Sequence, residues 1–472
     1  MIEILASSSL TTAQRRFSRR PVAGALVVAS LLAPLAASAA TIQVTSNGNG
    51  LGAAGVCTLR SAVAAIAGGA TNAACTAATG AFGTADTITF APAVTLINFD
   101  SYGNGITLPD RTLTIQGTGF GGVTLQRTAA AASTFSIVVS NSSGPALTLN
   151  GLTIEGGSGS FGGGVRMNSY GGDLTISNSV IRNNTAGTGG GVGGAYGGSI
   201  TINNSAITGN TATNSGGGVY MVGAFDLVGT TLSGNTSANW GGGAYLQAWC
   251  ADGRVANTTI SGNSTTGNFG GGLVVDSRGS CVASTARLFN NTITANNTAG
   301  GGTGTGLNCY GGNITLSSNI LYGNSGSDVR ASDCAASGTP SLTGVGNIVG
   351  VFGAAVNGGV YTGLTGTLSG NPLLAPLANN GGSILTHALL AGSPAINAGS
   401  NPGALANDAR GVGYARVVGA AADIGAFEFG AGVVVTAAPT VPVPATGLSA
   451  LFAGALGVLV TAFGALRRRR SQ

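Results

Sequence analysis

The 472-residue sequence contains 84 Gly, 19 Arg, no Lys, 14 acidic residues and one His, and its formal net charge is +5. A charged fraction of only 7% excludes a coiled coil and a charge-rich disordered chain, and Gly lacks the three-residue period of collagen. Eight Arg lie in the two terminal segments, whereas the stretch from Thr41 to Gly430 holds eleven Arg and thirteen acids. The basic excess therefore belongs to the ends, and we expect no nucleic-acid partner.

Residues 1–40 are typical of a secretory signal peptide. Arg15–Arg20 contain four basic side chains, Val22–Leu35 form an apolar segment, and Ala37–Ala40 offer small residues for cleavage. An uncleaved anchor helix is the alternative, but the apolar segment is short for a membrane span. We therefore expect export by the cell's export machinery, with the route left open.

Residues 41–100 are expected to form an N-terminal cap. Thr41–Val44 (TIQV), followed by Val56–Val63 (VCTLRSAV), resembles the CSLREA domain of bacterial surface proteins. Thr58 stands where that domain usually has Ser, and Ser61 where it has Glu. The resemblance implies a bacterial surface protein.

Residues 101–350 carry a repeat of about 26 residues. A Gly triplet recurs at 162–164, 189–191, 216–218, 241–243, 270–272 and 300–302, and an Ile/Leu-x-x-Asn motif alternates with it, ending at Asn184, Asn210, Asn235, Asn263, Asn296 and Asn324. Short stretches rich in Thr, Ile and Val lie between Gly and Asn separators, which favours strands. The sequence predicts an all-β fold: a right-handed parallel β-helix, a pectate-lyase-like solenoid with one rung per repeat.

Stacked rungs lie about 4.8 Å apart, so equivalent residues form columns. We expect Ile and Leu columns to fill the interior, Asn side chains to bond along a ladder, and Gly triplets to supply positive φ at a corner. The alternation of Gly-Gly-Gly-Val or -Ala with Ile-x-x-Asn over about 150–330 resembles the repeats of polymorphic outer-membrane proteins, which are β-helical surface passengers.

Six Cys fall as sequential neighbours: Cys57 and Cys75, Cys250 and Cys281, and Cys309 and Cys334. They favour structural disulfides in an oxidising compartment, with the overall connectivity left open. Because Cys309 and Cys334 are one repeat apart, we predict that they stack and bond, and we predict Cys250–Cys281 across a longer repeat.

Catalysis on a β-helix would need converging carboxylates or a base beside bound calcium. The best candidates are Asp252 and Arg254 with Asp276 and Arg278, one rung apart, which are otherwise a surface ion-pair group. Asp226 and Asp173 are expected to share a solvated column with Ser199, Arg254, Arg287 and Asn313. No Cys-x-x-Cys, Lys or second His occurs, so we expect no metal and no cofactor.

Three aromatic residues, Phe161, Trp240 and Phe269, each precede a Gly triplet. They are either an aromatic track for sugar rings or residues that pack a corner.

Residues 351–430 resemble the choice-of-anchor C-terminal domain, which precedes interchangeable sorting signals. The resemblance rests on 370–382 (GNPLLAPLANNGG), 386–399 (THALLAGSPAINAG) and 423–428 (DIGAFE). It implies architecture and address rather than chemistry. The sole imidazole, His387, lies in this domain, and we expect it to be structural.

The C-terminal segment combines a linker at 431–446, which contains Pro442 and Pro444, with an apolar run at 447–466. Arg467, Arg468, Arg469 and Arg470 follow, so residues 447–472 predict a transmembrane helix with a cytoplasmic C-terminus. The arrangement resembles PEP-CTERM and IPTL-CTERM sorting signals, which implies a membrane sorting protease as a partner; a permanent anchor is the alternative.

These features predict an exported protein of the cell envelope or surface, with a structural, adhesive or matrix role and no catalysis. Its expected partner is surface polysaccharide or another envelope protein. The alternative is a β-helix that binds or degrades polysaccharide as a lyase or hydrolase.

Overall fold

The computed structural model describes residues 39–432, except for 84, 101–102, 141–145, 168–171, 268, 278–283, 300–303, 312, 333–340, 356–360 and 362. The predicted signal peptide, the linker and the predicted membrane helix with its Arg cluster lie outside these residues. Within them, no helix is long and apolar enough to cross a membrane.

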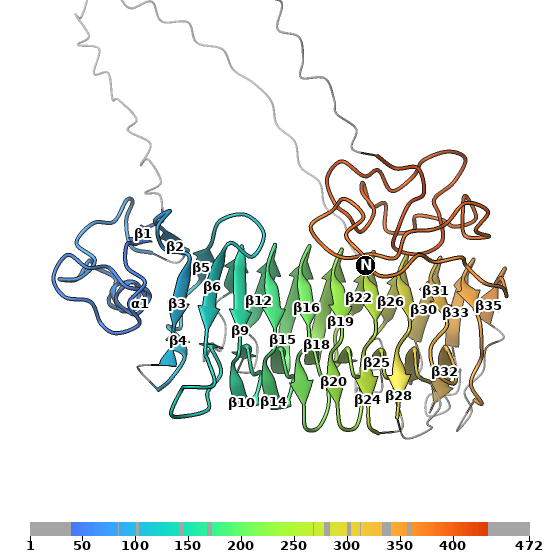
Figure 1. The fold of residues 1–472 in the computed structure, drawn as a ribbon, viewed down its shortest axis with the longest axis horizontal. Coiled ribbons are helices and arrows are strands. Elements are labelled where there is room, and N and C mark those ends of the chain that lie inside the picture. Colours follow the sequence, from blue (N-terminus) through green and yellow to red (C-terminus); the bar gives the residue numbers. More distant parts are fainter. Residues whose placement is uncertain are drawn as a thin grey trace, which may run out of the picture. The chain divides into compact units, whose positions relative to one another are not determined.

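Parallel strands dominate the described chain and form three sheets, in which each strand pairs with its counterpart one rung later (Figure 1). The largest sheet consists of two stacks that β15 (Val192–Asn203) and β18 (Val219–Val228) join, so the strands form four stacks. We call them stacks A to D in the order in which a rung visits them. Stack A contains β4 (Ile106–Leu108), β7 (Val138–Ser140), β11 (Val165–Met167), the first parts of β15 and β18, β21 (Ala244–Gln247), β25 (Leu273–Asp276), β29 (Leu307–Tyr310) and β32 (Val329–Ser332).

The other stacks follow in chain order within each rung. Stack B contains β1 (Thr41–Val44), β2 (Asp86–Phe90), β5 (Leu113–Gln116), β8 (Leu147–Asn150), β12 (Asp173–Ser177), the second parts of β15 and β18, β22 (Gly253–Ala256), β26 (Ala286–Phe289), β30 (Asn313–Ser317), β33 (Ser341–Val345) and β35 (Gly363–Thr365). Stack C contains β3 (Leu96–Asn98), β6 (Val123–Gln126), β9 (Leu152–Glu155), β13 (Val180–Arg182), β16 (Ala206–Thr208), β19 (Thr231–Ser233), β23 (Thr259–Ser261), β27 (Thr292–Thr294), β31 (Ile320–Tyr322) and β34 (Ile348–Val349). Stack D contains β10 (Ser158–Phe161), β14 (Thr185–Thr188), β17 (Thr211–Ala212), β20 (Thr236–Ser237), β24 (Ser264–Thr265) and β28 (Asn297–Thr298).

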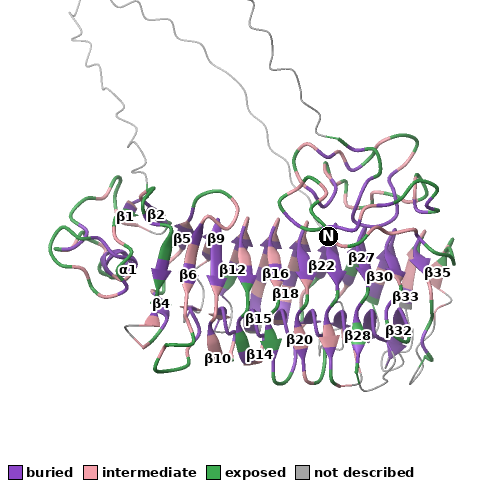
Figure 2. Cartoon of the chain, viewed as in Figure 1, coloured by how far each residue is buried: buried purple, intermediate pink, exposed green. Residues whose placement is uncertain are grey.

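Many strand residues are buried (Figure 2), and apolar side chains from successive rungs form one core, as the repeat predicts. In stack C one column occupies the same register through successive rungs, and all of its members are fully buried: Ile154, Ile181, Ile207, Leu232, Ile260, Ile293 and Leu321. In-register stacking gives each of these side chains an apolar neighbour above and below, which is how strands of three residues bury a face.

A buried Asn ladder runs beside this column, between stacks C and D. The Nδ2 of each Asn donates to the Oδ1 of the next at 2.8–3.0 Å, through Asn184, Asn210, Asn235, Asn263, Asn296 and Asn324. The ladder ends where Asn324 donates to the carboxylate of Asp328 at 2.7 Å. The predicted Asn ladder is therefore confirmed, and burial raises the pKa of its terminal carboxyl, Asp328.

The Gly triplets form the corner that leads back to stack A. The first Gly of a triplet has a positive φ, as at Gly216 (67°). The second and third have no room for a side chain, because a Cβ on Gly217 would lie 2.3 Å from the carbonyl oxygen of Gly242. Successive corners thus touch through their backbones, which only Gly permits.

The N-terminal end carries α1 (Leu59–Gly68), within the segment that resembles the CSLREA domain. The Thr58 hydroxyl caps the helix by accepting from the amide of Ser61, and Gly69 ends it in the left-handed conformation. Cys57 and Cys75, whose Cα atoms are 4.6 Å apart, form a disulfide beside the helix.

After β35 the chain forms an irregular body of turns and short bridges, which ends at Gly432 (orange to red in Figure 1). Backbone carbonyls of this C-terminal body accept hydrogen bonds from the turns and strands of several rungs. Examples are the Leu385 oxygen from Thr231, the Asn407 oxygen from Asn257 and the Ser400 oxygen from Asn290.

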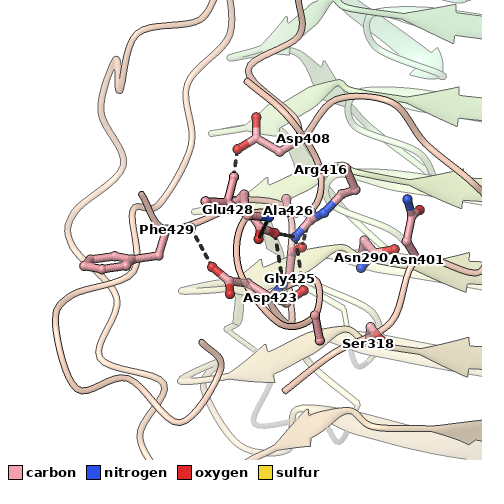
Figure 3. Close-up of polar contacts among 12 residues, drawn as sticks. Asn290, Ser318, Asn401, Asp408, Arg416, Asp423, Gly425, Ala426, Glu428 and Phe429 are labelled. Carbon is pink, nitrogen blue, oxygen red and sulfur yellow. Dashed lines mark hydrogen bonds and ion pairs between the residues drawn. The ribbon is translucent and has the colours of Figure 1, made fainter. Parts of the chain in front are cut away.

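A buried polar network holds the C-terminal body together (Figure 3). The Arg416 side chain is fully buried and pairs with Glu428 at 2.8 Å, and it also donates to the Gly425 carbonyl and to Asn257 of the β-helix. Asp408 pairs with Arg410 at 2.6 Å and accepts from the Glu428 amide. These residues include parts of the segments that resemble the choice-of-anchor domain, and their roles here are internal.

Candidate functional site

The aromatic residues singled out in the sequence lie along the corner that leads into stack A. Ser215, Trp240 and Phe269 form successive parallel bridges, and Phe161 pairs with Thr188 earlier in the same series. Trp240 is 40% exposed.

Two Tyr residues on the outer face of stack A complete the array. Tyr220 and Tyr245 stack in register with ring centroids 5.2 Å apart, and Trp240 stacks on Tyr245 at 5.9 Å with planes 18° apart. Phe161 meets Tyr220 edge-on at 5.9 Å. We call Phe161, Tyr220, Trp240 and Tyr245 the aromatic array. Neither Tyr was among the predicted site residues, although each follows a Gly triplet at the same distance, in Gly-Gly-Gly-Val-Tyr and Gly-Gly-Gly-Ala-Tyr.

Asp276 lies on the same face, one rung beyond the array. It is only 1% exposed, and its Oδ2 accepts from the Tyr245 hydroxyl at 3.0 Å. In register, Asp276 stands between Gln247 and Tyr310. The third predicted aromatic residue, Phe269, meets Tyr310 edge-on at 6.5 Å and lies beneath the Arg330 guanidinium.

A hollow of about 430 Å³ opens on stack A toward the N-terminal side of the array. Its lining combines hydroxyls, an amide and backbone with two apolar side chains and one guanidinium: Asn104, Gly105, Thr107, Thr134, Phe135, Ser136, Val139, Gly159, Ser160 and Arg166. Arg166, in the lining of the hollow, pairs in register with Gly193, which pairs with Tyr220, so the hollow and the array share one column of stack A.

Asp252 and Arg254 belong instead to stack B. Arg254 stacks on Asp226 and binds both of its carboxylate oxygens at 2.6 Å. Asp252 accepts from the Thr285 hydroxyl at 2.7 Å and lies 3.5 Å from Arg287, and the Thr285 hydrogen bond lowers the pKa of Asp252. These exposed pairs border a hollow of about 250 Å³.

The described members of the candidate group Asp252, Arg254, Asp276 and Arg278 do not all lie in one stack. Asp276 stands in a different stack from the other two, and Arg278 lies outside the described residues. Rung lengths vary, so counting residues from one repeat to the next does not give the register.

The predicted mixed column also needs correction. Asp226, Arg254 and Arg287 do share one column. Asp173 pairs with Ser199, whereas the residue that pairs with Asp226 is Thr201, two residues later in the same strand. Asn313 pairs with Ser341. The outcome is two separate polar columns on the face of stack B.

His387 is buried between the C-terminal body and the β-helix. Its Nδ1 donates to the Ala375 carbonyl at 2.7 Å, so its Nε2, 2.8 Å from the Ser261 hydroxyl, accepts. Burial lowers the pKa of His387. Across the described part of the chain, no group of three or more His, Cys, Asp or Glu could hold a metal ion.

The cysteines match the predictions in part. The Cys57–Cys75 pairing is formed, and Cys250 is disulfide-bonded, while its predicted partner Cys281 lies outside the described residues. Cys309 is buried, and the residue stacked on it is Ala331. The register therefore contradicts the reason for pairing Cys309 with Cys334, which itself lies outside the described residues.

Comparison with known proteins identifies the fold. Residues 113–287 match the family model for a right-handed β-helix region, which confirms the predicted right-handed parallel β-helix. Among solved structures, the chain is similar to the crystal structure of pectate lyase Pel9A, with 17% identity, a TM-score of 0.47 and coverage of 82% of this chain and 96% of that chain. A search of curated proteins found no match.

Proposed function

We propose that this chain is an exported bacterial β-helix protein, held at the cell envelope or surface, with a structural, adhesive or matrix role and no catalysis. The predicted signal peptide and C-terminal sorting segment support this address, as do the resemblances of 41–100, 150–330 and 351–430 to domains of surface proteins. The Cys57–Cys75 disulfide fits an oxidising compartment.

The observation that carries the non-catalytic role is the separation of the candidate acids. Asp252 is exposed, and its lowered pKa keeps it ionised, which makes it a poor general acid. Asp276 is buried in another stack beneath Tyr245. Glycoside hydrolysis requires two carboxyl groups that flank one bond. Asp252 and Asp276 lie on different stacks of the β-helix.

The outer face of stack B supports an adhesive role. Thr114, Thr148, Thr175 and Thr201 stack in register, and each is partly exposed. This column presents the same hydroxyl at four successive rungs before it continues as Asp226, so a repetitive partner could meet several weak contacts at once.

The alternative is a polysaccharide-degrading enzyme, and one observation favours it: Asp276 lies directly beside the aromatic array. The purified protein should be incubated with a panel of uronate and neutral polysaccharides, and the products measured by release of reducing ends and of unsaturated sugars. We expect no turnover by wild type. Turnover that disappears in Asp276→Ala would overturn the non-catalytic role.

The address has a separate test. Intact cells should be treated with an external protease and then fractionated. We expect the protein in the envelope or medium and accessible to the protease; a protected cytoplasmic pool of full-length chain would contradict export.

A further inference from the structure

The aromatic array is a rigid surface with one exposed ring. Trp240 is 40% exposed, yet it is stacked on Tyr245, which is 6% exposed and is itself stacked on Tyr220. The hydrogen bond from Tyr245 to the buried Asp276 fixes the supporting ring from its far end. The indole is therefore held in place before any partner arrives, which reduces the entropy lost on binding.

The hollow of about 430 Å³ lies next to this ring and offers a different chemistry. Thr107, Ser136 and Ser160 contribute hydroxyls, and Asn104 contributes an amide. The register connects the two regions, since Arg166 of the hollow pairs with Gly193, and Gly193 pairs with Tyr220 of the array. The aromatic array and the hydroxyl-rich hollow thus lie one after the other along stack A.

We propose that this surface binds an uncharged polysaccharide laid along stack A, with a sugar ring against Trp240 and neighbouring sugars hydrogen-bonded in the hollow. A pyranose ring has an apolar face that suits an indole and a rim of hydroxyls that suits Ser, Thr and Asn. The four rings of the array are uncharged, and the carboxylate of Asp276 is buried under Tyr245. Arg166 is the one charged side chain in the lining of the hollow, and its guanidinium N–H groups can donate to sugar hydroxyls.

The stacking of the rungs gives the polysaccharide a continuous path along stack A. Strands of stack A lie about 4.8 Å apart, so a polymer running along the stack passes from one rung to the next and remains on the same face. This inference rests on the proposed adhesive role and names its ligand class.

The chain offers a direct optical test, because it has two Trp, Trp240 and Trp249. In Trp249→Phe, the fluorescence of Trp240 alone reports binding. Soluble neutral β-glucan, xylan and mannan should be titrated into this variant, with polygalacturonate and alginate as acidic probes. We expect at least one neutral polysaccharide to shift the emission, and Trp240→Ala to weaken its binding about tenfold when measured by calorimetry.

Two variants control this measurement. Phe429→Ala removes an aromatic residue of similar exposure (39%) from the C-terminal body and should leave affinity unchanged. Trp240→Phe keeps a smaller ring and should retain part of the affinity. Thermal unfolding of each variant checks that the fold is intact.

Wild-type affinity in a folded Trp240→Ala protein would overturn the inference, and so would binding confined to acidic polysaccharides and abolished by salt. Failure of every neutral polysaccharide to bind would also overturn it and would leave the non-catalytic envelope role standing. Cleavage of a bound polysaccharide would instead overturn that role, so the two failures are distinguishable.

Discussion

Removing one rung of the buried Asn ladder should destabilise the β-helix far more than removing an exposed Asn. In Asn235→Ala, the Ile207 carbonyl loses a donor at 2.8 Å, and the Asn210 backbone amide loses its acceptor at 3.0 Å. Both groups are buried. At about 1–3 kcal/mol for each unpaired group, the free energy of unfolding should fall by about 2–6 kcal/mol.

Asn239→Ala is the matched control. Asn239 is exposed, and its Nδ2 donates to Asn214 at 2.7 Å in a side-chain pair open to solvent. Its removal should cost less than about 0.5 kcal/mol.

Guanidinium unfolding followed by circular dichroism gives the two losses, and hydrogen exchange at the Asn210 amide reports the local effect. Exchange at Asn210 should accelerate in Asn235→Ala and not in Asn239→Ala. Equal losses of stability in the two variants would refute the reasoning, because the ladder would then contribute no more than a surface contact.

Three further predictions concern the turns and the C-terminal body. Gly229→Asn should stabilise by about 1 kcal/mol, because φ is already +55°, a Cβ there meets nothing nearer than 3.9 Å, and the partnerless buried Oδ1 of Asn204 would gain a donor; a lower melting temperature would contradict this. His387 has a lowered pKa, so its contribution to stability is complete above about pH 6.5, the ordinary value for His, and is lost as the pH falls below it. His387→Gln should therefore flatten the difference in unfolding free energy between pH 7.5 and pH 5.5, and an unchanged difference would exclude His387 as its source. Arg416→Ala leaves Glu428 buried without its cation and should cost about 3–5 kcal/mol, with early proteolysis of 363–432, whereas Arg182→Ala at an exposed pair should cost below about 1 kcal/mol; similar proteolysis of the two variants would argue against the network.

The fold could be predicted from the sequence because the repeat carries its own register. Each Ile/Leu-x-x-Asn motif supplies one residue of the Ile/Leu column and one of the Asn ladder. Because the rungs stack, residues at equivalent positions of successive repeats become neighbours in space. The Gly triplets could be predicted for the same reason, since close backbone approach leaves no alternative residue.

The candidate site could be predicted only in part. Trp240 and Phe161 could be predicted because each directly precedes a Gly triplet. Tyr220 and Tyr245 lie on the strand after the triplet, and their equivalence becomes visible only when the repeats are aligned by their Gly triplets. Cys309 stacks on Ala331, 22 residues later, and not on a residue 25 later, because the chain between stacks varies in length. Side-chain pairs that cross rungs, such as Asp226 with Arg254, depend on these local lengths, which composition and period do not determine.

The attachment of the C-terminal body has a mechanical consequence. Its hydrogen bonds to Thr231, Asn257, Asn290 and Thr292 come from rungs well before the last one. A pull on the chain beyond Gly432 would therefore load several rungs in parallel and along their contact surface, instead of peeling the final strand from its neighbour. Peeling breaks hydrogen bonds one after another at low force, whereas parallel loading requires many hydrogen bonds to break together. The C-terminal body would therefore protect the last rungs of the β-helix from unfolding under tension.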